Sequence, residues 1–178
     1  MLRRGTFALF FSATLALLFH SSPARAQEAG VSLAVGVASP ASGFTTAAST
    51  GYDIALQIRT DPIIGPLALR IDIGYARFPG KGAISYTTQA AGPAVSLVGD
   101  IGSRFYWAAG PGYYQSQLKT QILGHNVTVQ NSYLGAQAAL GVNFRIIRWD
   151  CYFEASAVRD LQRGVNIAWV PLRFGVRL

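Results

Sequence analysis

Residues 52–59 read Tyr-Asp-Ile-Ala-Leu-Gln-Ile-Arg, and large apolar side chains occupy every second position of this stretch. Residues 67–76 repeat the pattern, with large apolar residues separated by small or polar ones. Because successive side chains of a β-strand point to opposite faces, both stretches are predicted to be strands with one apolar and one polar face. The segment between them, Asp61-Pro-Ile-Ile-Gly65, is typical of a short turn, so the two strands are predicted to form a hairpin.

Six further stretches alternate in the same way, namely residues 30–38, 87–100, 104–115, 132–144, 150–158 and 167–178. The connections between the predicted strands alternate in length. Residues 39–50, 78–86, 116–131 and 159–166 are long and rich in small and polar residues, whereas 61–65, 101–103 and 145–149 are short. An even number of strands joined by long and short connections in turn is typical of a transmembrane β-barrel. The predicted fold class is therefore all-β, a closed eight-stranded antiparallel up-and-down transmembrane β-barrel.

The composition distinguishes a membrane barrel from a soluble one. Charged residues make up 13% of the 178 residues, and Lys and Glu are both scarce. A soluble protein surface carries about 25–35% charged residues, so the polar face of these strands is too poor in charge to face water. That face is instead rich in Ala and Gly, which suits the narrow interior of an eight-stranded barrel. We therefore predict that the apolar face contacts lipid and that the polar face lines the lumen.

The first 26 residues have the layout of a secretory signal peptide. Its three parts are a basic start at Arg3 and Arg4, an apolar run from Thr6 to Phe19, and the small-x-small sequence Ala24-Arg25-Ala26. The apolar run is shorter than the roughly 20 residues that a membrane-spanning helix needs. Cleavage is therefore predicted between Ala26 and Gln27, which leaves residues 27–178 as the barrel domain.

Removal of the signal peptide also lowers the positive charge of the chain. Taking Arg3, Arg4 and Arg25 from the 15 basic residues leaves 12 against 8 acidic ones, a net charge of +4. The remaining Lys and Arg residues are scattered rather than clustered, so the sequence does not predict a nucleic-acid partner.

Aromatic residues gather near the ends of the predicted strands. Tyr52, Tyr75, Phe78, Tyr86, Tyr113, Tyr133 and Trp169 fall at the loop-side ends, and Phe105, Trp107, Phe144, Trp149 and Phe174 fall at the turn-side ends. Tyr and Trp are enriched at both membrane–water interfaces of membrane proteins. The pattern predicts two outward-facing aromatic belts, and ordinary strand aromatics are the alternative.

Nine ionisable residues are predicted to point into the lumen. They are Asp53, Arg59, Arg70, Asp72, Asp100, Arg104, Glu154, Arg173 and Arg177. Buried charges need partners of opposite sign, and neighbouring strands supply both signs. We expect an interior network of salt bridges and hydrogen bonds that fills the lumen, with Gly74, Gly135, Gly141 and Gly175 making room for the Arg side chains. A narrow polar conduit or gate remains the alternative.

Residues suited to catalysis or metal binding are few. Cys151 is the only cysteine and His125 is the only histidine after residue 26, so neither a disulfide nor a His/Cys metal site is predicted. A Ser-His-Asp triad could be built only from His125, Asp160 and a loop serine. We therefore predict no catalytic, cofactor-binding or metal-binding residues. His125 is interpreted as an exposed loop residue and Cys151 as a small apolar side chain on a strand.

The sequence shares three features with a known family of membrane proteins. They are the signal peptide, the eight alternating strands and the strand that ends the chain. Over residues 27–178 it resembles the small outer-membrane β-barrels of the OmpA/OmpX type. Such barrels usually end in an aromatic residue, and this chain departs from that pattern because it ends Phe174-Gly-Val-Arg-Leu178.

The resemblance implies a protein of the bacterial outer membrane with a structural or surface-interaction role. The partners it implies are outer-membrane lipid and lipopolysaccharide, the outer-membrane assembly machinery, and a host or environmental ligand at the long loops. Neither a cofactor nor nucleic acid is expected. Two alternatives remain, a soluble periplasmic barrel that binds a small ligand and a lipid-modifying enzyme of the outer membrane.

Overall fold

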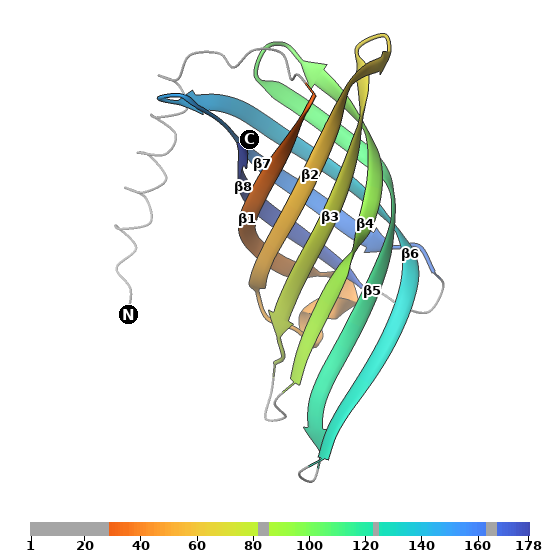
Figure 1. Cartoon of the computed structure of the whole chain (residues 1–178). Coiled ribbons are helices and arrows are strands. Elements are labelled where there is room, and N and C mark those ends of the chain that lie inside the picture. Colours follow the sequence, from red (N-terminus) through yellow and green to blue (C-terminus); the bar gives the residue numbers. More distant parts are fainter. Residues whose placement is uncertain (1–28, 82–85, 123–124, 163–166) are drawn as a thin grey trace.

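The structure, a computed structural model, describes residues 29–81, 86–122, 125–162 and 167–178. Within them eight strands close into one antiparallel barrel, in which neighbours along the chain pair and the last strand pairs with the first (Figure 1). The strands are β1 (Gly30–Ala41), β2 (Gly51–Ile64), β3 (Leu67–Pro79), β4 (Tyr86–Ile101), β5 (Phe105–Ile122), β6 (His125–Ile146), β7 (Trp149–Asp160) and β8 (Ala168–Arg177). The predicted fold class is confirmed. The predicted signal peptide and its cleavage site lie outside the described residues.

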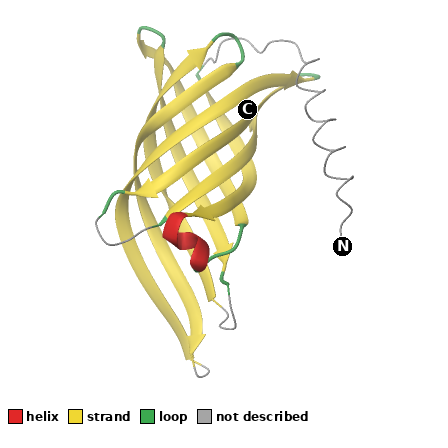
Figure 2. Ribbon diagram, turned by 180° about the vertical axis from the view of Figure 1, so that it is seen from behind, coloured by secondary structure: helices red, strands yellow, loops and turns green. Residues whose placement is uncertain are grey.

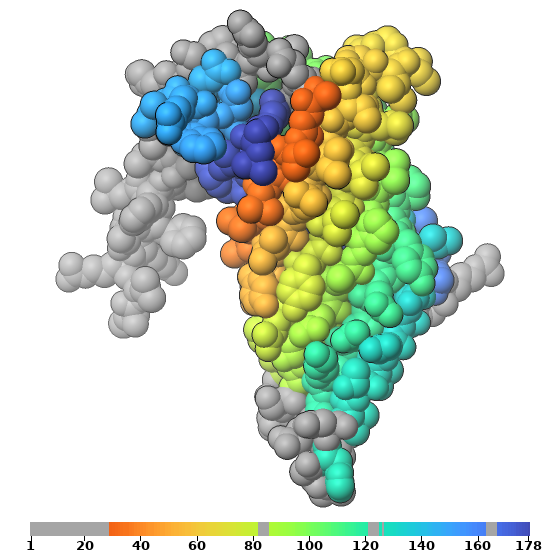
Figure 3. Space-filling model, viewed as in Figure 1, coloured from red at the N-terminus to blue at the C-terminus, as the bar shows by residue number. Residues whose placement is uncertain are grey.

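The outer wall of the barrel is apolar. Its exposed side chains include Leu33, Val35, Ile54, Ile73, Val95, Leu97, Leu134, Leu140, Phe153, Leu172 and Phe174. The residues that alternate with them are buried and face the lumen, as the period of two in the sequence predicts. In the space-filling view the side chains of neighbouring strands form a continuous wall (Figure 3).

The described residues contain one short helix, the 3-10 helix η1 (Ser42–Thr46), in the connection between β1 and β2. It lies against the end of the barrel opposite the short turns (Figure 2). No helix in the described part of the chain is long and apolar enough to cross a membrane.

Residues 116–122 and 125–131 form paired strands, so the prediction of a long loop over residues 116–131 is wrong. β5 and β6 stay paired as far as Ile122 and His125, and the hairpin projects beyond the other strands (Figure 1). The loop was predicted from the abundance of Gln, Asn and Ser. Pairing prevails because Thr120, Val127 and Val129 are β-branched and lie on one face, which favours a strand. His125 is exposed, but it is the first residue of β6 rather than a loop residue.

The turn between β2 and β3 also differs from the predicted turn at residues 61–65, because most of those residues belong to β2. β2 continues past Arg59 to Ile64, and its register with β3 shifts on both sides of Pro62. Proline has no N–H to donate to a neighbouring strand, so an irregular pairing at this position has a physical cause.

Candidate functional site in the barrel lumen

Glu154 of β7 is completely buried in the lumen, and donors from four other strands surround it. Its Oε2 accepts hydrogen bonds from Arg70 Nη1 at 2.5 Å and from the Tyr106 hydroxyl at 2.9 Å. Its Oε1 accepts from Gln57 Nε2 at 3.3 Å and from Arg173 Nη1 at 3.5 Å. Charge-assisted hydrogen bonds of this kind are about twice as strong as neutral ones. Glu154 therefore connects opposite walls of the barrel.

Each guanidinium that binds Glu154 also binds an aspartate. Arg173 contacts Asp53 through both Nε and Nη2, and the Nη2–Oδ2 distance is 3.2 Å. Arg70 Nε donates to Asp72 Oδ2 at 3.0 Å. All five side chains are at most 5% exposed. In this central cluster three carboxylates thus face two guanidiniums, which leaves one negative formal charge in excess.

Gln137 of β6 extends the central cluster toward η1. Its Nε2 donates to Asp72 Oδ2 and to Ser96 Oγ, both at 2.8 Å, and its Oε1 accepts from the Tyr114 hydroxyl at 3.3 Å. Asp72 Oδ1 has no hydrogen-bond partner within the described part of the chain. Asp53 and Asp72 line a cavity of about 20 Å³. That volume admits about one water molecule and is far below the roughly 300–1,000 Å³ of a small-molecule pocket.

Tyrosine rings occupy the lumen beside the central cluster, and glycines make room for them. A Cβ atom on Gly141 would lie 2.2 Å from the Tyr106 ring, and one on Gly175 would lie 2.1 Å from the Tyr152 ring. The prediction that the inward glycines make room for Arg side chains is therefore wrong at these positions, because flat rings pass directly over the backbone there. A Cβ atom on Gly74 would lie 3.7 Å from the Arg173 guanidinium. A Cβ atom on Gly135 would lie 2.9 Å from both the Tyr114 ring and the Arg159 carbonyl oxygen.

A second group of buried side chains, which we call the aromatic lid, lies in the lumen at the end that carries η1. It consists of Phe44 from η1, Phe78, Tyr114, Tyr133 and Trp169. Ring centroids are 5.1 Å apart for Phe44 and Phe78, 6.2 Å for Phe78 and Trp169, 5.5 Å for Tyr114 and Trp169, and 5.8 Å for Tyr114 and Tyr133. Such pairs contribute about 0.5–1.5 kcal/mol beyond their burial.

Three members of the lid were expected elsewhere. The prediction that Phe78, Tyr133 and Trp169 belong to an outward belt is wrong, since all three are buried in the lumen. They were assigned by their nearness to strand ends, but each shares the inward face with small or polar neighbours on its own strand. On the outer wall, exposed aromatic residues remain at both ends, among them Tyr52 and Tyr113 on the loop side and Phe105, Trp149 and Phe174 on the turn side.

The other four predicted inward charges lie nearer the short turns. Arg59 and Asp100 form a two-point ion pair with N–O distances of 3.4 and 3.1 Å, and the Asp100 side chain is 28% exposed. Arg177 Nη2 donates to Asn143 Oδ1 at 3.4 Å. Arg104 is half-buried beside the start of β5. The nine predicted residues therefore divide into a central cluster of five and a turn-side group of four.

The sequence pattern did not draw attention to three neutral members of the network. Tyr106, Tyr114 and Ser96 bond to the central cluster or to Gln137, whereas the predicted network consists of charged residues. The alternation of β4 and β5 already places these three on the inward face, so the same pattern could have found them.

The residues considered for catalysis do not come together. Asp160 pairs with Gly135 on β6, and His125 lies ten positions away along that strand, a separation of about 30 Å. Cys151 is buried and its sulfur lies 3.7 Å from the Trp149 carbonyl oxygen. Among the described residues, no group of three or more His, Cys, Asp or Glu side chains is placed to hold a metal ion.

Comparison with known proteins identifies the class of fold. No family model and no curated protein sequence matches this chain. Its fold is similar to that of Neisserial surface protein A, with 15% identity, a TM-score of 0.57, and 84% of this chain and 96% of that chain covered. It is also similar to Ail, the attachment invasion locus protein of Yersinia pestis, in complex with the heparin analogue sucrose octasulfate. There the identity is 13%, the TM-score 0.61 and the coverage 85% and 100%.

A major outer membrane protein from Thermus thermophilus is similar as well, with 12% identity, a TM-score of 0.55 and coverage of 83% and 99%. The names of these three proteins describe a surface protein, an attachment protein and an outer-membrane protein. The chain has the fold of the small outer-membrane β-barrels, and the predicted resemblance is confirmed at the level of fold.

Proposed function

We propose that this chain is a bacterial outer-membrane β-barrel protein with a closed lumen, exported by its first 26 residues. It acts through its outer surfaces, as a structural component of the membrane and as a site of interaction at the cell surface. The observation that carries this proposal is the central cluster around Glu154, covered on one side by the aromatic lid.

The buried cluster argues against a role in transport. Ionic contacts reach from Arg70 on β3 to Glu154 on β7, and from there to Arg173 on β8, so they cross the lumen. Opening a water path there would separate paired charges that are almost completely buried. The cavity of about 20 Å³ beside the cluster also argues against the alternative of a soluble barrel that stores a small ligand.

The projecting β5–β6 hairpin supports a role in surface interaction. β7 leaves β6 at Gly135, and no described strand pairs with the outer edge of β6 from His125 to Ser132. An unpaired edge offers N–H and C=O groups to an added strand, which is a known mode of peptide recognition. This hairpin is where we expect an external ligand to bind.

The closed lumen predicts that the protein does not form a pore. The purified, folded barrel should show no stable, porin-like conductance in planar bilayers. Phe44→Ala, which opens only the aromatic lid, should remain closed because the central cluster is intact. A stable and large single-channel conductance from the folded wild-type monomer would refute the closed lumen.

The proposed topology predicts which end of the barrel faces the outside of the cell. Two single cysteines, Thr128→Cys in the hairpin and Ser103→Cys in a short turn, are placed in a Cys151→Ala background. Both positions are exposed. A membrane-impermeant maleimide should label the hairpin cysteine on intact cells and the turn cysteine only after the outer membrane is opened. Labelling of the turn cysteine alone on intact cells would invert the topology.

A further inference from the structure

A groove of about 530 Å³ runs along the outer wall of the barrel, over β1 to β5. Its floor includes Ala91 and Pro93 of β4, and larger side chains on the neighbouring strands form its sides. Tyr75 and Ile73 of β3 pair with Ala91 and Pro93 respectively, and Tyr113 stands on β5. The groove thus arises because small residues on β4 lie between large ones on β3 and β5.

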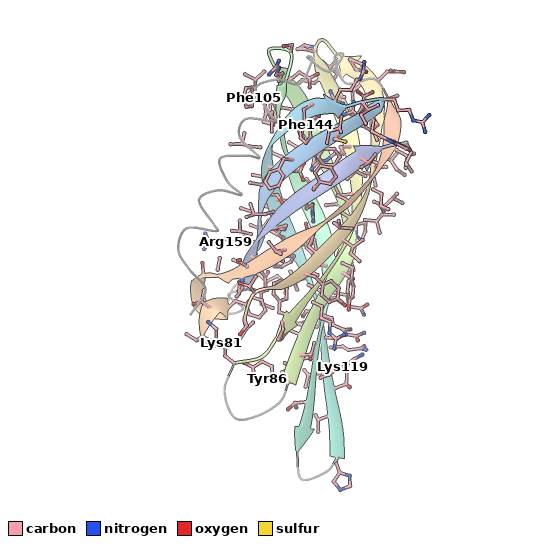
Figure 4. The ribbon with its side chains drawn as sticks, turned by 90° about the vertical axis from the view of Figure 1, so that its left-hand side faces the viewer. Lys81, Tyr86, Phe105, Lys119, Phe144 and Arg159 are labelled. Atoms are coloured by element: carbon pink, nitrogen blue, oxygen red, sulfur yellow. The ribbon has the colours of Figure 1, made fainter. Side chains whose placement is uncertain are left out.

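Basic side chains stand above the end of this groove that is nearer the hairpin. Arg77 is exposed and lies two residues beyond Tyr75 on the same face of β3, about 7 Å further along the strand. Its guanidinium interacts with the Tyr52 side chain. Lys119 is exposed on β5, at the base of the hairpin (Figure 4).

The register of the strands fixes the spacing of these two cations. Arg77 pairs with Gln89 of β4, Gln89 pairs with Gln117 of β5, and Lys119 is two residues further along β5. The two backbone positions are therefore two strands apart and two residues offset, which corresponds to about 12 Å.

No negative charge balances this pair of cations within the part of the chain that the structure describes. Neither Arg77 nor Lys119 forms an ion pair with a carboxylate there. Asp53, Asp72, Glu154 and Asp160 are buried in the lumen, and Asp61, Asp100 and Asp150 lie toward the short turns. This end of the outer wall is thus cationic above an apolar groove.

We propose that the groove and its two cations bind a glycolipid that carries two phosphate groups, of the lipid A class. An acyl chain lies in the groove between Tyr75 and Tyr113, and the phosphates lie beside Arg77 and Lys119. Arg binds phosphate through paired N–H donors, and Lys binds it as a point charge. Two cations about 12 Å apart fit a diphosphorylated headgroup better than a single phosphate. The proposal rests on the proposed function, because that function places this wall in the outer membrane.

Native mass spectrometry of the folded barrel in detergent micelles tests the site, with diphosphoryl lipid A as the probe. The wild type should bind one lipid A molecule, with lower affinity for monophosphoryl lipid A and least for phosphatidylcholine. Arg77→Gln should weaken binding of diphosphoryl lipid A about tenfold, since a charge-assisted contact of this kind is worth about that factor. Arg159→Gln is the matched control, because Arg159 is also exposed at this end of the barrel but lies on β7, away from the groove. It should bind as the wild type does.

A second variant tests the apolar half of the site. Ala91→Leu fills the floor of the groove and leaves the charges unchanged, so it should weaken lipid A binding while heat-modifiable migration shows an intact barrel. Equal losses in Arg77→Gln and Arg159→Gln, or equal binding of phosphatidylcholine, would overturn the site. Maleimide labelling at Thr128→Cys tests the membrane location separately. If the Thr128→Cys variant is labelled as predicted but Arg77→Gln binds lipid A as the wild type does, the lipid site is refuted and the membrane location is not.

Discussion

Leu140→Arg is expected to shift the balance between the folded and the unfolded barrel strongly toward the unfolded state. Leu140 is 65% exposed on the apolar wall, in the middle of the part of β6 that belongs to the barrel. An arginine that faces lipid near the bilayer midplane costs about 2–4 kcal/mol. Such a cost corresponds to a loss of about thirtyfold to a thousandfold in the folding equilibrium, since about 1.4 kcal/mol is a factor of ten.

The measurement is the fraction of heat-modifiable, folded protein in lipid vesicles as the urea concentration is raised. Gln115→Arg is the matched control, because Gln115 is exposed on the outer wall at the loop-side end of the barrel. Near an interface the cost of arginine falls to about 0–1 kcal/mol, so this variant should assemble normally. An unchanged urea midpoint for Leu140→Arg would show that the wall does not face lipid, and would favour the alternative of a soluble barrel.

The sequence predicts which side chains of each strand face lipid and which face the lumen, because this depends only on a local period of two. Leu140 and Glu154 lie on the sides that this period assigns to them. The pairing of the charges was not predictable. Arg70 and Glu154 are 84 residues apart, and their contact depends on how the strands are staggered when the barrel closes. The sequence therefore indicates which charges lie in the lumen, but not which of them meet.

The aromatic lid shows a different limit of sequence reasoning. Phe44 belongs to η1, a segment without alternation, so no periodic pattern could place its ring against Phe78. The error for Trp169 has another cause, because its position near a strand end outweighed its place on the inward face. In a barrel this narrow, an aromatic side chain at a strand end can point into the lumen as readily as toward the membrane–water interface.

Arg173→Met is expected to destabilise the barrel by about 3–5 kcal/mol, the usual cost of removing one partner from a buried ion pair. The reason lies in the charge balance of the central cluster. Arg173 binds both Asp53 and Glu154, so its loss leaves three buried carboxylates with a single guanidinium. Methionine keeps much of the side-chain volume, so the loss of charge rather than a cavity should dominate. Urea unfolding of the barrel in lipid vesicles measures the change in the free energy of unfolding.

Asp72→Asn is the matched variant, and it should be close to neutral. It removes one carboxylate, so two carboxylates then face two guanidiniums. The asparagine oxygen can still accept from Arg70 Nε and Gln137 Nε2, which now bind Asp72 Oδ2. Its amide group would replace Asp72 Oδ1, an atom without a hydrogen-bond partner among the described residues. Because the two variants change the cluster charge in opposite directions, their difference isolates the charge balance from the packing. Equal destabilisation by both would mean that packing and hydrogen-bond geometry, not the excess negative charge, limit the stability of the barrel.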